Sequence, residues 1–138
     1  MEKDYKLLKW ISKNIKMHEL IANEFTWVTQ YLLAFSLKNM TSNFFAISTR
    51  NSYNYIRALM LQKALIYKNI TLLYNLCKKY NISYIFITNE LGYYDIAKQR
   101  YKYLSLYEKN KIIKILDVSY FLKSKIVYDL GRIYKVKG

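Results

Sequence analysis

The sequence has 138 residues, the length of one ordinary domain, and 53% of them are hydrophobic, which is enough to build a core. This composition excludes a disordered basic tail and a collagen-like chain, and no stretch is long and apolar enough for a membrane-spanning helix. The 23 Lys and Arg residues against 9 Asp and Glu residues give a formal net charge of +14. An AT-rich genome favours lysine codons and would explain part of this surplus of basic residues. The rest of the surplus predicts a polyanionic partner.

The first half of the chain is predicted to be mainly helical. We expect a short helix from Asp4 to Ile15, and apolar residues at steps of three and four predict an amphipathic helix from Met17 to Lys38. A further helix is expected from Asn43 to Tyr53. A short strand at Ala58–Leu61 and a helix over Ile66–Tyr80 follow.

The second half is predicted to be rich in strands. Ser83 to Thr88 is aromatic and β-branched and predicts a strand, and Asn89 to Asp95 contains a glycine and reads as a hairpin loop. Lys102 to Tyr107 predicts another strand. Ile112 to Val118 could be a strand or a short helix, and Lys125 to Tyr128 a final extended segment.

This order of elements predicts an α+β fold, a small helix-strand-helix-strand-strand domain preceded by an N-terminal helical extension. We assign residues 1–40 to the extension and residues 41–138 to the domain.

Residues that could carry catalysis are few. His18 is the only histidine and Cys77 the only cysteine, so the chain forms neither an internal disulfide nor a zinc site of the usual type. Cys77 lies on the apolar stripe of its helix and is expected in the core. Glu90 and Asp95 flank a loop, and a nuclease or other enzyme using that loop remains an open alternative. We expect no enzymatic activity, no metal and no cofactor.

Basic and amide side chains give a stronger signal. The segment from Thr49 to Asn54 combines an arginine, two amides, hydroxyls and a tyrosine, a mixture that suits contacts to phosphates, sugar hydroxyls and base edges. The alternative is a polar helix end with a solvated arginine. The candidate RNA-binding residues are Arg50, Asn51, Tyr53, Asn54, Arg57, Lys63, Lys109, Lys111, Lys123 and Lys125.

The order of several weak motifs resembles the N-terminal domain of small-subunit ribosomal protein eight. Ser48 to Tyr53 resembles the end of that family's first helix, and Leu76 to Ile82 resembles the end of its second. Tyr80 or Asn81 stands where the family has a glycine, and asparagine tolerates the left-handed conformation required there. The remaining matches are Ala58 to Leu61, Ser83 to Thr88, Tyr103 to Tyr107, Val118-Ser119 with Lys125 to Tyr128, and Leu130 to Val136 as the link to a C-terminal domain that this chain lacks.

The resemblance implies a structural constituent of a mitochondrial small ribosomal subunit that binds the central domain of the ribosomal RNA. Its partners would be that RNA, neighbouring ribosomal proteins and a separately encoded C-terminal half, with no small-molecule substrate and no membrane span. The resemblance implies a protein of the mitochondrial matrix. Because the N-terminus does not have the pattern of an import presequence, we expect the protein to be organelle-encoded, the alternative being a presequence that has been removed. The alternative is a small basic nucleic-acid-binding protein of an AT-rich virus.

Overall fold

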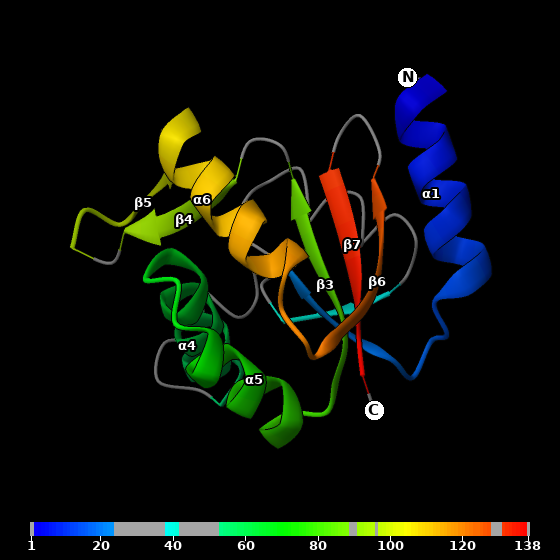
Figure 1. Cartoon of the computed structure of the whole chain (residues 1–138), viewed down its shortest axis with the longest axis horizontal. Helices are drawn as coiled ribbons and strands as arrows, with labels where there is room; N and C mark the ends of the chain where they lie inside the picture. Colours follow the sequence, from blue (N-terminus) through cyan, green and yellow to red (C-terminus); the bar gives the residue numbers. More distant parts are fainter. Residues whose placement is uncertain are drawn as a thin grey trace.

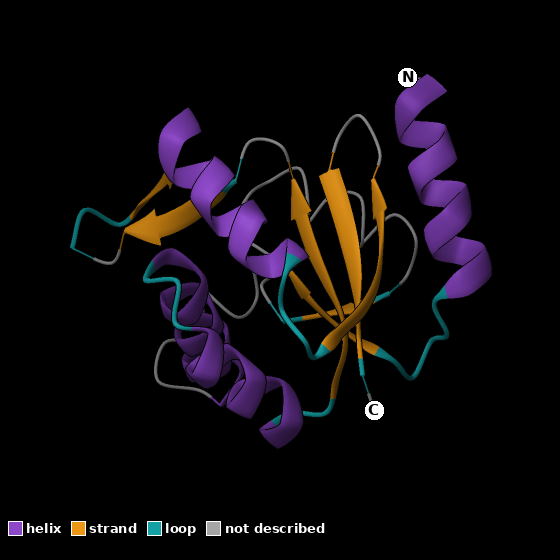
Figure 2. Cartoon of the chain, viewed as in Figure 1, coloured by secondary structure: helices purple, strands orange, loops and turns teal. Residues whose placement is uncertain are grey.

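The computed structural model describes residues 2–23, 38–41, 53–88, 91–95, 97–127 and 131–137. The described elements are a mixture of helices and strands (Figure 2), and the strands pair both parallel and antiparallel, so the expected α+β class is confirmed, and so is the helix near the N-terminus. None of the helices in these ranges is long and apolar enough to cross a membrane. The elements are, in chain order, α1 (Glu2–Asn14), β1 (Leu20–Asn23), β2 (Asn39–Met40), α4 (Tyr53–Ile66), α5 (Ile70–Lys79), β3 (Ile82–Thr88), β4 (Gly92–Asp95), β5 (Arg100–Tyr103), α6 (Leu106–Asp117), β6 (Leu122–Val127) and β7 (Gly131–Val136).

Five of the strands form a mixed sheet in the order β2-β1-β3-β7-β6. β1 runs parallel to both β2 and β3, whereas β7 runs antiparallel to β3 and to β6. β3 and β7 lie side by side near the middle of the sheet (Figure 1). β3 carries no charged residue and is rich in branched and aromatic side chains, which suits a strand buried on both faces.

Helices cover both faces of this sheet, and alternate residues of β3 face the two layers. Phe86 lies in one buried cluster with Leu7 and Ile11 of α1. Ile85 and Ile87 belong to the larger cluster that the sheet forms with α4, α5 and α6. Figure 1 shows α1 on one side of the sheet and the other three helices across it. The fold is therefore a helix–sheet–helix sandwich with a core on each side of the strands.

The prediction of a helix from Met17 to Lys38 is wrong for the residues of this segment that the structure describes. Leu20 to Asn23 forms β1, which pairs with two neighbouring strands, so tertiary pairing overrides the helical spacing of its apolar residues. Because β1 and β2 share a sheet with β3, the boundary expected at residue 40 divides that sheet. Residues 24–37 and nearly all of the helix expected from Asn43 to Tyr53 lie outside the described ranges.

The short strand expected at Ala58–Leu61 is also wrong, because these residues belong to α4. Ala58 and Leu61 are buried on one helical stripe with Ala64 and Leu65, and the spacing of three and four residues is that of a helix. The helix expected over Ile66–Tyr80 begins later.

α5 begins at Ile70 because the chain turns just before it. Lys68 has a φ of 55°. Asn69 caps the new helix, its side chain accepting a hydrogen bond from the Leu72 amide at 3.1 Å. At the other end Asn81 has a φ of 52°, which confirms the left-handed conformation expected there. Cys77 is buried in the core as expected.

Between Leu91 and Val127, the strands and the turn of the hairpin lie at residues other than those expected. Gly92 to Asp95 is a strand, β4, that pairs with β5, and the turn between them lies at residues 97–99. β5 ends at Tyr103, and Ser105 caps α6 by accepting a hydrogen bond from the Glu108 amide at 3.2 Å. Of the two alternatives for Ile112–Val118, the helix is confirmed.

Candidate functional site

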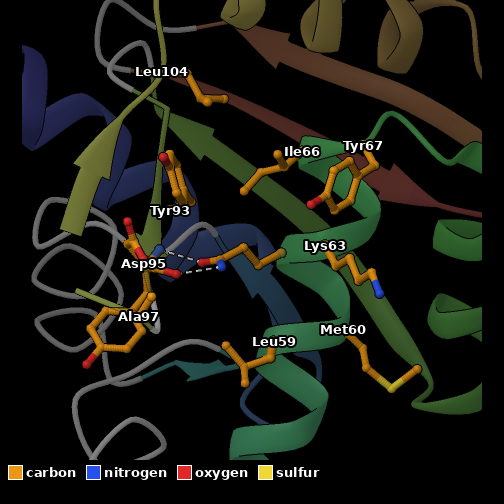
Figure 3. A pocket seen from close by; sticks show the side chains of 11 residues that line it. Leu59, Met60, Lys63, Ile66, Tyr67, Tyr93, Asp95, Ala97 and Leu104 are labelled. Carbon is orange, nitrogen blue, oxygen red and sulfur yellow. Dashed lines mark hydrogen bonds between the residues drawn. The ribbon is translucent and has the colours of Figure 1, made fainter. Parts of the chain in front are cut away.

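A cavity of about 530 Å³ lies between α4 and the hairpin formed by β4 and β5. Figure 3 shows side chains from both elements facing one another across it. Its size is within the range that binds a small molecule or a short polymer segment. Its walls are formed by Leu59, Met60, Gln62, Lys63, Ile66, Tyr67, Tyr93, Tyr94, Asp95, Ala97 and Leu104.

Gln62 of α4 fixes the position of the hairpin. In an antiparallel pair of strands, every second pair of opposite residues exchanges backbone hydrogen bonds. The Leu104 amide donates to the Leu91 carbonyl, so counting in steps of two from this pair leaves Tyr94 and Tyr101 as a pair without such bonds. The N–H and C=O of Tyr94 therefore point away from β5. The Tyr94 amide donates to Oε1 of Gln62 at 2.6 Å, and Nε2 of Gln62 donates to the Tyr94 carbonyl at 2.9 Å (Figure 3). One side chain thus takes the place of a neighbouring strand.

Replacing Gln62 with leucine is expected to loosen the hairpin. The substitution leaves the two polar backbone groups of Tyr94 without these partners in a partly buried place, which costs about 1–3 kcal/mol. Amide hydrogen exchange at Tyr94 should accelerate at least tenfold. Gln62→Glu is the matched variant, because it keeps the acceptor for the Tyr94 amide, and it should accelerate exchange less. Unchanged exchange in Gln62→Leu would contradict this role.

A fixed negative charge lies at one end of the cavity. The Asp95 carboxylate forms an ion pair with Lys102 at 3.1 Å and accepts a hydrogen bond from the Lys98 amide at 3.2 Å. The hydrogen bond from Lys102, with that from Lys98, holds the pKa of Asp95 below its usual value of 3.8. The carboxylate is therefore ionised at neutral pH, and its charge is largely matched by Lys102.

Tyrosine rings and aliphatic side chains make up most of the remaining wall. Tyr93 is half-buried, and Tyr67 is 71% exposed. Leu59, Ile66 and Leu104 supply apolar surface. The cavity is therefore mainly apolar, with its polar groups at the hairpin and at the solvent edge of α4.

Of the RNA-binding residues expected from sequence, Lys63 lines this cavity. Arg50 and Asn51 lie outside the described residues. The Arg57 guanidinium lies 5.7 Å from the ring centroid of Tyr53 and 6.0 Å from that of Tyr80. Partial burial lowers the pKa of Arg57, and its Nε is buried without a hydrogen-bond partner. The geometry gives Arg57 a packing role between α4 and α5. Tyr53 and Asn54 are both exposed at the start of α4.

The remaining expected contacts lie on other elements and are not brought to this cavity. Lys109 and Lys111 are on α6, where the Lys111 ammonium lies 4.2 Å from the ring centroid of Tyr107. Lys123 and Lys125 are on β6. The candidate RNA-binding residues therefore occupy at least three separate elements.

Of the two carboxylates considered for catalysis, the structure describes Asp95. Glu90 lies outside the described residues, and Asp95 is held by Lys102. Asp117 accepts a hydrogen bond from the Tyr134 hydroxyl at 2.7 Å, which joins the end of α6 to β7. Within the described ranges, no group of three or more His, Cys, Asp and Glu side chains could hold a metal ion.

Sequence reasoning missed the two residues that define the cavity. Gln62 is the polar interruption of an apolar run in α4, a pattern that indicates a buried amide in need of partners. Tyr93 lies in a Gly-Tyr-Tyr-Asp segment whose burial alternates, and its tyrosines favour a strand over a loop.

The fold is similar to a solved structure over nearly the whole of both chains. The crystal structure of the C-terminal globular domain of an oligosaccharyltransferase from Archaeoglobus fulgidus aligns with 99% of this chain and 98% of that chain. The TM-score is 0.58 and the sequence identity 12%, which shows a shared fold alone. No family model and no curated protein sequence matches the chain.

This similarity overturns the resemblance to ribosomal protein eight and the ribosomal function it implied; the viral alternative likewise has no support. Several of the weak motifs also lie in elements other than those the resemblance requires. Ala58–Leu61 is helical instead of a strand, and Leu130–Val136, expected to be a link, contains a strand inside the sheet. Short motifs of common residues recur by chance, so their order alone did not identify a family.

Proposed function

We propose that the chain is a binding domain that acts in glycan transfer, and that the cavity between α4 and the β4–β5 hairpin holds a short segment of polypeptide. The fold similarity to a domain of an oligosaccharyltransferase supports the first part. The lining of the cavity supports the second and is the observation that carries it.

The polar groups of the cavity are largely committed to the protein itself. Gln62 bonds the Tyr94 backbone, and Asp95 pairs with Lys102. A sugar ring carries several hydroxyls, each of which needs a partner when it is buried. An apolar or aromatic peptide side chain needs none and would gain from contact with Tyr93 and the aliphatic wall. The cavity therefore favours a peptide over a sugar.

The proposed role is recognition, with the chemistry of transfer carried out elsewhere. Tyr93 and the aliphatic wall would contact an apolar side chain of the segment, and Lys63 would meet polar backbone groups at the solvent edge of α4. The expectation that the chain is not an enzyme stays a prediction, and so does the expectation that it binds no cofactor.

The test is selection from a pooled library of random hexapeptides on the immobilised chain, read by mass spectrometry. Peptides that share an apolar or aromatic residue should be enriched. Tyr93→Ala should lower the affinity of a selected peptide at least tenfold, and Tyr93 is only half-buried, so the melting temperature should change by a few degrees at most.

Tyr103→Ala is the matched control for this test. Tyr103 is a tyrosine of the same hairpin, is 57% exposed and does not line the cavity. Its loss should leave peptide binding unchanged. A selection that enriches no peptide, or an equal loss of affinity in both variants, would contradict the proposed ligand.

A further inference from the structure

A second hollow, of about 560 Å³, lies at the end of the sheet where β3 begins and β7 ends. The start of β3 and the end of β7 are near the C-terminal label in Figure 1, whereas the hairpin follows the opposite end of β3. The seven residues of β3 span about 20 Å between these two ends. Four lysines line this hollow, which we call the basic groove: Lys78, Lys123, Lys135 and Lys137.

The four lysines come from three elements that the fold brings to one place. Lys78 is in the last turn of α5, and Lys123 is at the start of β6, where β6 and β7 change register. Such a bulge redirects a side chain from the regular alternation of a strand. Lys135 is near the end of β7, and Lys137 follows the strand directly. The Lys137 amide donates a hydrogen bond to the Phe121 carbonyl at 2.8 Å, which holds this end of the chain beside the start of β6.

Four lysines and one acidic residue lie among the described residues of the basic groove, so its wall carries a net positive charge. Within the described part of the chain, none of its four lysines forms an ion pair with a carboxylate. Glu19 is the acidic residue on its wall, and Oε1 of Glu19 accepts a hydrogen bond from the Lys16 amide at 2.7 Å. A hydrogen bond with Tyr74 raises the pKa of Lys78, so this ammonium group is charged at neutral pH. Like charges that line one hollow repel one another, and a bound anion would relieve that repulsion.

The shape and lining of the basic groove distinguish between kinds of anion. Lysine binds phosphate as a compact point charge, and Asn81 and Ser83 add hydrogen-bonding groups to the same wall. Among the described lining residues the single aromatic ring is that of Tyr74. The Lys78 ammonium lies 4.8 Å from the centroid of the Tyr74 ring, and the ring centroids of Tyr74 and Phe121 are 5.4 Å apart. The Tyr74 ring therefore offers little surface for stacking a nucleobase. A bounded hollow with several point charges fits clustered phosphates better than a nucleic-acid strand.

We propose that the basic groove binds a ligand that carries two or more phosphate groups, presented either by a soluble molecule or by a lipid headgroup. This site is separate from the peptide cavity, and the proposal does not depend on the function proposed for that cavity.

The experiment titrates the full chain with inorganic pyrophosphate and follows backbone amides by NMR, at low and at physiological salt. Amides of Asn81, Ser83 and Lys137 should shift together and saturate. The double variant Lys123→Gln, Lys135→Gln should bind at least tenfold more weakly. Lys9→Gln with Lys13→Gln removes the same charge from the exposed surface of α1, and this control should change the affinity less than twofold.

A second arm identifies the source of the phosphates. Sedimentation with vesicles that contain phosphatidylinositol bisphosphate, competed by pyrophosphate, would assign the ligand to a lipid headgroup, whereas pyrophosphate binding without vesicle binding would assign it to a soluble molecule. Either result supports the proposal. It is overturned if pyrophosphate shifts no groove amide, if both double variants lose affinity equally, or if an RNA duplex binds the groove and pyrophosphate does not displace it.

Discussion

Replacing Phe86 with alanine should lower the free energy of unfolding by about 3–5 kcal/mol, the range for removing a buried aromatic ring. Phe86 is 1% exposed and lies on a central strand of the sheet, in the cluster that joins the sheet to α1. The substitution removes contacts with Leu7 and Ile11 and leaves a cavity that neighbouring strands hold open. Urea denaturation monitored by circular dichroism measures the change.

Leu106→Ala is the control for this prediction. Leu106 is 70% exposed at the start of α6, so its truncation should change the free energy of unfolding by less than about 0.5 kcal/mol. A loss below about 1 kcal/mol in Phe86→Ala would show that α1 does not pack on the sheet as described.

Replacing Gly131 with alanine should be comparably damaging, for a different reason. A Cβ at this position would lie 2.4 Å from the Ile87 carbonyl oxygen and 3.0 Å from the Thr88 Cα. Both atoms belong to the backbone of β3 and cannot turn aside, so the start of β7 would have to move away from its partner strand. We expect a loss of about 3 kcal/mol or more, which is at the upper end for overpacking a core.

Thermal unfolding of Gly131→Ala measures this effect, with Lys135→Ala on the same strand as the control. Lys135 is exposed, so its truncation should leave the melting temperature nearly unchanged. A Gly131→Ala variant that melts with the wild type would mean that β3 and β7 are not in close contact at this point.

Some elements could be predicted from sequence because their own residues specify them. The branched and aromatic run of β3 and the apolar spacing of α1 are local signals, and both elements form as expected. β1 and β7 are different, because pairing with neighbouring strands, and not a local sequence pattern, makes each of them a strand. Leu20 to Asn23 fits a helical spacing, and no local pattern could show that β7 pairs with β3 and β6.

The candidate site was beyond sequence reasoning for a similar reason. Gln62 and Tyr94 are 32 positions apart, and their pairing depends on how α4 meets the hairpin. The basic residues were visible as a surplus of charge, but the sequence does not show that Lys78, Lys123 and Lys135 line one groove while Arg57 packs against tyrosine rings. The mitochondrial location that the resemblance implied stays a prediction.

The position of β7 has a consequence for the order in which the molecule assembles. This strand comes last among the described elements, yet it fills a place between β3 and β6 inside the sheet. During synthesis, one edge of β3 therefore stays open until residues 131–137 have left the ribosome. An apolar strand with an open edge can pair with another copy of itself, so the nascent chain is most prone to aggregate in the interval before residues 131–137 emerge. Pairings across such long separations also slow folding, which lengthens that vulnerable interval.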